Sequence, residues 1–371
     1  MIKVFQVSSD SNIGGAGKCI LTYLEHFDRS KFDMTVVLPE NSLLKPKVEA
    51  LGVRVIEVSG IAEKSLGAEG IKNLVVLFRK EKPDVVHTHG SMSARVAAKL
   101  TGCRGIVYTR HSVFEPSPKI SKGIGKIING FINNFFTHRI IAVAEAAKKN
   151  LTDCGVSEKK ISVILNGIKP VEPMSEEEKS SVRESFGIEK GQTVISLLAR
   201  IEKVKGHSIL IDAVKTVIDR GYNLKVIIAG TGSYEDVVKE KVKALGLSDK
   251  VIFTGFVEDV RGIVNISDIS ANASFGTEAT SIALLEGMCL GKPAVVSDFG
   301  GNPGVIKDGV NGFLFTSENA DEMADAICRI LDDRELYQKL SDGAKKIFSS
   351  TFTADIYTEQ ISKMYERLKV K

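Results

Sequence analysis

Apolar runs of strand length alternate with helical patterns along almost the whole chain, in two series. In the first series they lie at 2–7, 34–38, 53–58, 84–89, 105–110, 139–143 and 162–165. The second series starts at Thr193 and continues at 224–229, 251–255, 294–297 and 312–315. Strands that are apolar without alternation are covered on both faces, and helical crossovers make neighbouring strands parallel. The expected fold class is therefore α/β, with two Rossmann-like, doubly wound parallel-sheet domains.

A change of composition near residue 170 separates the two series. Residues 167–192 contain Pro170, Pro173 and an acidic run at 176–178, which is typical of an interdomain linker with a short helix. We expect an N-terminal domain at 1–169 and a C-terminal domain that starts at residue 170. The length of 371 residues is sufficient for two full cores.

Charge is divided unevenly between the two halves. Residues 1–170 hold 25 Lys and Arg against 15 Asp and Glu, whereas residues 171–371 hold 25 against 31. A basic N-terminal half suits an acidic partner, such as anionic lipid, an anionic acceptor or nucleic acid. No basic motif interleaved with aromatic residues marks a nucleic-acid module, so nucleic acid is not expected as a partner.

The cysteines and the hydropathy pattern indicate a cytoplasmic protein. The five cysteines are scattered and unpaired by spacing, which is typical of small core residues in a reducing compartment. No metal-ligand cluster is visible, and no metal is expected. No apolar run is long enough to span a bilayer, and residues 1–7 form a strand pattern rather than a signal peptide.

The stretch 274–304 carries the strongest chemical signal. Ser281 is a candidate N-cap for a short apolar helix, and the N–H groups of its first turn, near Ile282, can bind a phosphate. Glu278 lies in the loop before this helix and Glu286 about two turns later, so both can accept hydrogen bonds from hydroxyl groups. A ligand with hydroxyl groups on both sides of a phosphate is typically a nucleotide sugar. The pair alone would also fit two surface glutamates, but the flanking glycines favour a binding site.

Three further loops follow predicted strands, at the edge where α/β sheets bind ligands. The loop G-G-A-G begins with Gly14 and Gly15, and a tight turn without a ligand explains it equally well. Arg200 and Lys205 stand at a strand–helix junction and suit a diphosphate, although each alone fits a solvated surface charge. Gly230 opens a G-T-G-S turn after the strand 224–229.

Three histidines lie at the ends of predicted strands. His87 and His89 are two residues apart and face the same side. A metal pair would need a third ligand that the sequence does not supply, so we expect one packed histidine and one that lines a cleft. His111 follows the strand 105–110, where a capping or core role is the alternative to a role in chemistry.

The stretch 274–304 resembles the signature of glycosyltransferase family 4, which comprises retaining enzymes of the GT-B fold. The family pattern is E-x7-E, then G-x-P, a strand and G-G-x-P-E, and its matches here are Glu278, Glu286, Gly291, Pro293, Gly300, Gly301 and Pro303. Gly304 replaces the final Glu, and residues 279–281 replace the usual turn. Weaker matches are A-R-I-E-K-V-K-G at 199–206, with Ala199 for Gly, and N-G-I-K at 166–169, with Lys169 for Asp.

The resemblance assigns roles to these residues. The C-terminal domain, 170–352, would hold the donor, and the N-terminal domain the acceptor across a cleft, with the terminal helix 353–371 packed back on it. The implied catalytic set is His111, Arg200, Lys205 and Glu278. The implied donor-binding set is Gly14, Gly15, Asn166, Gly230, Ser281, Ile282 and Glu286, with His89 on the acceptor side. Front-face attack assisted by the donor's own phosphate would need no metal and no cofactor.

The expected function is transfer of a sugar from a nucleoside diphosphate sugar, with a UDP-sugar favoured, to a lipid-linked or envelope glycan. The alternatives are a nucleotide-sugar epimerase, an inverting GT-B enzyme and a non-catalytic nucleotide-sugar binding protein. The sequence leaves the sugar, the base, the acceptor and the oligomeric state open.

Residues 119–136 form an apolar helical stripe with lysines beside it. The stripe comprises Ile120, Ile124, Ile127, Ile128, Phe131, Ile132, Phe135 and Phe136, and Lys119, Lys122 and Lys126 lie off it. Such a helix can lie on an anionic membrane, which would make the protein peripheral on the inner face of the cell membrane. The clean stripe favours the alternative, a helix that packs its apolar side on the sheet.

Overall fold

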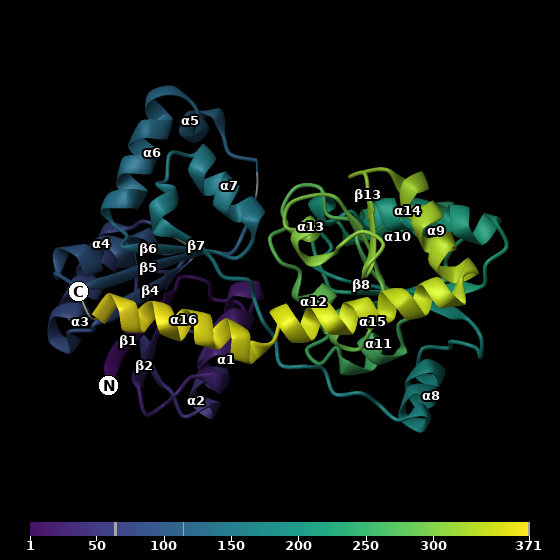
Figure 1. Cartoon of the computed structure of the whole chain (residues 1–371), viewed down its shortest axis with the longest axis horizontal. Coiled ribbons are helices and arrows are strands. Elements are labelled where there is room, and N and C mark those ends of the chain that lie inside the picture. Colours follow the sequence, from purple (N-terminus) through teal and green to yellow (C-terminus); the bar gives the residue numbers. More distant parts are fainter. Residues whose placement is uncertain (63–64, 114, 370–371) are drawn as a thin grey trace. The chain divides into compact units, whose positions relative to one another are not determined.

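The computed structural model describes residues 1–62, 65–113 and 115–369, which form two α/β units (Figure 1). The first unit comprises Met1–Lys169 with the C-terminal segment from Thr353, and the second comprises Pro170–Phe352. Each unit has its own parallel sheet and its own buried core.

The first unit contains a seven-stranded parallel sheet in the order β3-β2-β1-β4-β5-β6-β7. Its strands are β1 (Ile2–Ser8), β2 (Phe32–Leu38), β3 (Arg54–Glu57), β4 (Val85–His89), β5 (Gly105–Arg110), β6 (Arg139–Ala142) and β7 (Ile161–Val163). The order reverses between β1 and β4, and such a switch point places the loops after these strands beside each other.

Helices connect these strands. They are α1 (Gly15–His26), α2 (Lys45–Ala50), α3 (Ala68–Glu81), α4 (Met92–Leu100), α5 (Pro118–Ser121), α6 (Gly123–Phe135) and α7 (Glu145–Asp153), followed by the 3₁₀ turn η1 (Glu158–Lys160). Phe5, Val37 and Val86 of the sheet pack against Leu74 and Phe78 of α3 in one buried cluster.

The last helix, α16 (Ala354–Lys369), returns to the first unit and lies along its sheet (Figure 1). It contacts α1, β1, β4 and β5. Tyr365 of this helix is fully buried, and its hydroxyl lies 2.6 Å from Nδ1 of His87 in β4. At the start of the helix the N–H of Ala354 donates to the Ile168 carbonyl (3.0 Å). The C-terminal segment is thus part of the first core.

The second unit contains a six-stranded parallel sheet in the order β10-β9-β8-β11-β12-β13. Its strands are β8 (Thr193–Leu198), β9 (Leu224–Ala229), β10 (Val251–Gly255), β11 (Ile269–Asn272), β12 (Ala294–Ser297) and β13 (Gly312–Phe315). The sequence pattern did not predict β11, because I-S-A-N is short and half polar. All four of its residues are nevertheless buried, since β11 lies between β8 and β12.

The helices of the second unit are α8 (Glu176–Ser185), α9 (His207–Asp219), α10 (Glu235–Ala244), α11 (Arg261–Ile266), α12 (Ile282–Cys289), α13 (Asn302–Val305), α14 (Ala320–Asp332) and α15 (Arg334–Thr351). The acidic run at 176–178 opens α8, where Ser175 and Glu178 form a capping box. A 3₁₀ turn, η2 (Lys203–Lys205), leads into α9.

The amphipathic stretch 119–136 differs from its prediction in two ways. It forms two helices, α5 and α6, separated by the extended residue Lys122. The tight junction needs a glycine at 125, since a Cβ there would lie 1.8 Å from the Lys119 carbonyl oxygen. The expectation that the apolar stripe packs on the sheet is wrong, because Ile124, Ile127 and Phe131 are 74%, 70% and 66% exposed.

Instead, α6 packs through its small and amide side chains. A Cβ on the buried Gly130 would meet the Gly155 carbonyl oxygen at 2.1 Å, so the backbones approach closely at this point. The amide of Asn129 donates to the Cys154 carbonyl oxygen (2.7 Å), and Oδ1 of Asn133 accepts from Arg95 (2.8 Å). Hydrogen bonds of these amides therefore hold the polar face inward and leave the apolar face outward.

Candidate functional site

Two loops at the carboxyl edge of the second sheet are packed tightly together. The loop after β8 contains Lys205 and Gly206, and the loop after β11 begins at Ala273. Gly206 has φ +72°, and a Cβ there would lie 1.9 Å from the carbonyl oxygen of Ala273. The N–H of Phe275 donates to the carbonyl oxygen of Val204 at 2.9 Å. Only glycine permits this approach, which places Lys205 beside the second loop.

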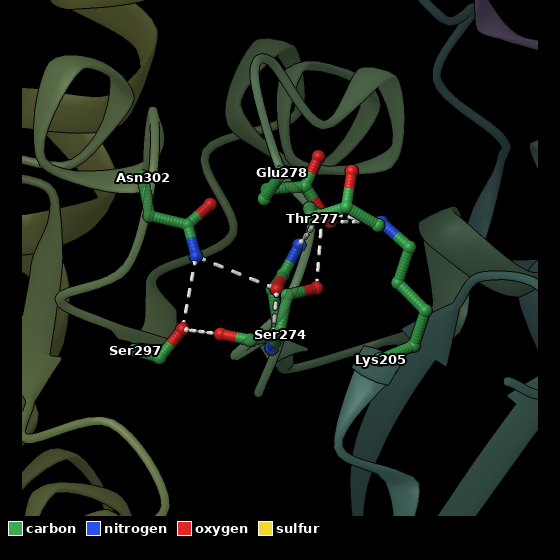
Figure 2. A network of polar contacts seen from close by, with 7 residues as sticks. Lys205, Ser274, Thr277, Glu278, Ser297 and Asn302 are labelled. Carbon is green, nitrogen blue, oxygen red and sulfur yellow. Dashed lines mark hydrogen bonds and ion pairs between the residues drawn. The ribbon is translucent and has the colours of Figure 1, made fainter. Parts of the chain in front are cut away.

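Lys205 and Glu278 form a partly buried ion pair (Figure 2). The Nζ of Lys205 lies 3.0 Å from Oε2 of Glu278 and also donates to the Thr277 carbonyl oxygen at 2.9 Å. The two side chains are only 15% and 9% exposed. Oε2 of Glu278 also accepts from Nδ2 of Asn272 and Oγ of Ser274, both at 3.1 Å. Three donors on one oxygen stabilise the carboxylate and hold it in one orientation.

A second layer of polar groups supports this pair. The hydroxyl of Ser297, at the end of β12, donates to the Ser274 carbonyl oxygen at 2.6 Å (Figure 2). Nδ2 of Asn302 donates to Oγ of Ser297 (3.2 Å) and approaches Oδ1 of Asn272 at 3.4 Å. The sequence pattern gave no indication that Asn272, Ser297 and Asn302 belong to the site. A buried asparagine at the end of a strand, beside the motif, was the available signal.

The two glycines at 300 and 301 pack against the backbone of Glu278. Gly300 has φ +62°, and a Cβ there would lie 2.3 Å from the carbonyl oxygen of Glu278. The N–H of Gly301 donates to that same oxygen at 3.1 Å. The G-G pair of the motif thus has a structural reason, which is to fix the peptide that carries the glutamate.

The helix α12 begins directly after this peptide. Ser281 is its N-cap residue by backbone conformation, as expected, but its side chain makes no capping hydrogen bond. Ser281, Ile282 and Glu286 are all half-buried. The positive end of the α12 dipole lies shortly after Glu278 in the sequence, and Glu286 lies about one turn into the helix.

Arg200 and the turn at Gly230 are neighbours at the same edge of the sheet. Arg200 is exposed. A Cβ on Gly230, which has φ +145°, would lie 2.1 Å from the Ala199 carbonyl oxygen, and the N–H of Ile201 donates to the Thr231 carbonyl oxygen at 2.9 Å. The structure gives Gly230 a packing role that places this turn against the loop of Arg200.

The glycine loop of the first unit leads into α1. Gly14 is the N-cap residue of this helix, with an extended backbone, and Gly15 is its first residue. A Cβ on Gly15 would meet no atom within 4 Å, and one on Gly14 would lie 3.5 Å from a carboxylate oxygen of Asp10. Neither glycine has a positive φ, so the tight-turn explanation does not require them. Gly14 is half-buried and Gly15 is exposed.

The three histidines contact one another in a row at the ends of β4 and β5. His87 is fully buried and bonded at both nitrogens, to the Tyr365 hydroxyl and to Oγ1 of Thr109, each at 2.6 Å. Nδ1 of His89 lies 2.8 Å from Nε2 of His111. His87 is the packed histidine that we expected. His89 is also buried, and His111 is half-buried.

Burial keeps these imidazoles neutral. Desolvation lowers the pKa of His87 to about 3 and the pKa of His111 to about 4. The pKa of His89 is also lowered, by burial first and then by its two histidine neighbours. All three rings therefore act as neutral hydrogen-bonding groups near pH 7.

Asn166 lies in the first unit, next to the start of α16. It is buried, and its Oδ1 has no hydrogen-bond partner among the described residues. The adjacent Gly167 packs so closely that a Cβ would lie 2.2 Å from the Thr353 carbonyl oxygen. The N-G element thus joins the end of the first chain segment to the returning helix.

The described residues offer no group of three His, Cys, Asp or Glu side chains that could hold a metal ion. Within the same residues, none of the helices combines the length and the apolar character needed to cross a membrane.

The chain has two doubly wound parallel sheets. The second sheet has a cationic loop, a glutamate and a helix N-terminus at its carboxyl edge. This architecture is that of the GT-B class of glycosyltransferases. Two family models match in succession: Glycosyltransferase Family 4 matches residues 13–172, and Glycosyl transferases group 1 matches residues 178–347. The chain belongs to glycosyltransferase family 4 and is a glycosyltransferase.

Relatives and solved structures agree with this assignment. An uncharacterized glycosyltransferase of Methanocaldococcus jannaschii is 29% identical, over 82% of this chain and 78% of the relative. UDP-Gal:alpha-D-GlcNAc-diphosphoundecaprenol alpha-1,3-galactosyltransferase of Escherichia coli is 26% identical, over 90% and 89%. The crystal structure of Anabaena HepE in complex with UDP and glucose is similar in fold, with a TM-score of 0.85 and 23% identity over 99% of this chain and 100% of that chain.

Proposed function

We propose that this glycosyltransferase transfers a sugar from a UDP-sugar to a lipid-linked or envelope glycan, with retention at the anomeric carbon. The donor assignment is supported by the UDP complex of HepE and by the UDP-Gal named for the Escherichia coli relative. The acceptor assignment is supported by the diphosphoundecaprenol-linked sugar in that relative's name.

The Lys205–Glu278 pair is the observation that carries the proposal. Holding two charged side chains that are only 15% and 9% exposed costs desolvation free energy, and charged groups placed in this way are typical of functional sites. When a diphosphate binds, the ammonium of Lys205 donates a hydrogen bond to a phosphate oxygen. It thereby stabilises the negative charge that develops on the leaving group. Arg200 and the first turn of α12, at Ser281 and Ile282, supply further positive potential to the same group.

The remaining residues hold the two ends of the donor. Glu278 keeps Oε1 for hydroxyls of the transferred sugar while Oε2 stays bonded to its three donors. Glu286 binds the ribose hydroxyls, and the turn at Gly230 lies under the nucleotide. In the first unit, the backbone at Gly14 and Gly15 approaches the phosphates and His111 meets the reacting sugar, with Asn166 on the donor side and His89 on the acceptor side. No cofactor is required, because these groups stabilise the diphosphate without one.

A panel of UDP-, GDP- and ADP-sugars tests the proposal. The expected result is calorimetric binding and slow release of UDP with one UDP-sugar, unchanged by EDTA. With that donor and a polyprenyl-diphosphate sugar as acceptor, NMR of the product should show the anomeric configuration of the donor. Inverted configuration would contradict retention, and binding without transfer or hydrolysis would favour a non-catalytic binding protein. An isomerised donor released without acceptor would indicate an epimerase.

Glu286→Ala tests the ribose assignment. The variant should bind the UDP-sugar about tenfold more weakly, because it loses hydrogen bonds to ribose hydroxyls. Calorimetry measures this affinity, with UDP and uracil compared as ligands. A loss for UDP but not for uracil is expected, and an unchanged affinity for UDP would remove Glu286 from the site.

The outward apolar face of α6 extends the proposal to an anionic membrane surface. Lys119 and Lys122 flank the start of this helix, and Nζ of Lys99 lies 4.9 Å above the ring of Phe135 near its end. Beyond that end, Arg104, His138, Arg139 and Lys160 line a cavity of about 640 Å³ together with Leu368. Exposed apolar side chains between basic groups suit the boundary between lipid tails and anionic headgroups.

A further inference from the structure

The carboxyl ends of β4 and β5 bring His89 and His111 into direct contact. His89 is the last residue of β4, and His111 follows β5. Their ring planes are 22° apart and their centroids 5.1 Å apart, and Nδ1 of His89 lies 2.8 Å from Nε2 of His111, so the two rings meet edge to edge. A hydrogen bond between two ring nitrogens needs one N–H and one lone pair. The tautomers of the two rings are therefore coupled.

Only two arrangements are available to this pair near pH 7. Both rings are neutral because burial lowers their pKa values, so each carries a single proton. In the first arrangement His89 donates from Nδ1 and its Nε2 is unprotonated. In the second arrangement His111 donates from Nε2, and the proton of His89 is then on Nε2.

The surroundings of Nε2 of His89 decide between them. This atom is buried and has no hydrogen-bond partner among the described residues. In proteins, a buried N–H group without an acceptor is rarer than a buried acceptor atom without a donor. Such an N–H costs the full free energy of its desolvation. The first arrangement avoids such an N–H, so His111 accepts at Nε2 and carries its own proton on Nδ1.

We propose that His89 is a positioning residue that holds His111 in the Nδ1–H tautomer, so that His111 offers a hydrogen-bond donor to an oxygen of the reacting sugar. Its place beside the sugar rests on the proposed function. The ring of His89 also packs against the ring of His87, with centroids 4.4 Å apart and planes tilted by 33°. His87 is itself bonded to Tyr365 and Thr109.

Two variants and one spectroscopic measurement test the proposal. In His89→Asn the side-chain amide keeps an N–H at the place of Nδ1, whereas His89→Leu has none. Two-bond ¹H–¹⁵N correlation spectra of the imidazoles at pH 7.5 report the tautomer of His111. Wild type and His89→Asn should show a protonated Nδ1 and an unprotonated Nε2, and His89→Leu should lose this pattern. The kcat of His89→Leu should fall about tenfold with a smaller change in KM, and His89→Asn should recover most of it.

Two results would overturn the proposal: a protonated Nε2 on His111 in wild type, or equal kcat values for the Asn and Leu variants. If His89→Leu does not fold, the wild-type and Asn spectra still decide the tautomer. His111→Ala separates this inference from the proposed function. Unchanged transfer by His111→Ala would remove His111 from the chemistry, whereas the spectra would continue to report whether His89 sets its tautomer.

Discussion

At the scale of single residues, the site of the second unit depends on a few close contacts around one carboxylate. Glu278 accepts three hydrogen bonds on Oε2, and its carbonyl oxygen is approached by Gly300 and Gly301. Lys205 is held by the glycine that follows it. The motif residues and the residues that contact them thus form one packed unit. Adding a methyl group or removing a charge there should change kcat or the free energy of unfolding.

Lys205→Ala should lower kcat by roughly a hundredfold, as the loss of one group that stabilises developing charge does. Steady-state rates with the UDP-sugar identified by the panel measure the effect. Lys203→Ala is the matched control, because Lys203 lies in the same 3₁₀ turn but is exposed. A near-normal rate for Lys205→Ala, equal to that of the control, would exclude Lys205 from catalysis.

Gly206→Ala should lower the free energy of unfolding of the second unit by roughly 2–5 kcal/mol, because it adds backbone strain at φ +72° and a Cβ 1.9 Å from the Ala273 carbonyl oxygen. Urea unfolding measures this change. Gly191→Ala separates the two causes, since Gly191 has φ +84° with no atom within 4 Å of a Cβ. It should cost only about 1–2 kcal/mol. Equal losses in both variants would mean that the contact with Ala273 is unimportant.

At the scale of elements, α6 shows that an amphipathic pattern does not say which face is buried. Its periodicity predicted a helix in this region, which the structure confirms. The predicted direction of the apolar face was wrong. The contact of Gly130 with Gly155 and the hydrogen bonds of Asn129 and Asn133 hold the opposite face of the helix inward. These contacts involve segments far apart in the sequence, so they cannot be predicted from the local hydropathy pattern.

Replacing Lys119, Lys122 and Lys126 by Glu should abolish sedimentation of the protein with vesicles rich in phosphatidylglycerol, because the charge beside the apolar face is reversed. The control replaces Lys72, Lys80 and Lys82, which are exposed in or just after α3, by Glu and should still sediment. Phe131→Ser should weaken binding as well. Equal sedimentation of both triple variants would rule out α6 as the membrane surface.

At the scale of the whole molecule, the first unit holds several neutral histidines and the second unit one, and the unfolded chain would protonate them. The pKa of His87 is lowered to about 3, and those of His111 and His207 to about 4, from an ordinary value of 6.5, each chiefly by burial. Between pH 6.5 and 4 the unfolded chain therefore binds more protons than the folded one. Stability must fall as the pH falls through this window, by on the order of 1 kcal/mol per histidine per pH unit.

Urea unfolding at pH 7.5, 6.5, 5.5 and 5.0 measures this dependence, and the two units provide their own comparison. His87→Gln should flatten the pH dependence of the first unit, and His207→Gln that of the second. A free energy of unfolding that is constant from pH 7.5 to 5.0 would contradict burial of these rings in the neutral form.

The sequence by itself determined the alternation of strands and helices, and from it the α/β class with two parallel sheets. It also located the motif around Glu278 and Glu286, since glycines, carboxylates and cations at set spacings are visible in one dimension. Only the tertiary structure decided that Asn272, Ser297 and Asn302 support Glu278, that His89 binds His111, and that α6 turns its apolar face outward. The physical reason is that periodicity defines which side chains share a face, whereas contacts with distant segments define what that face meets.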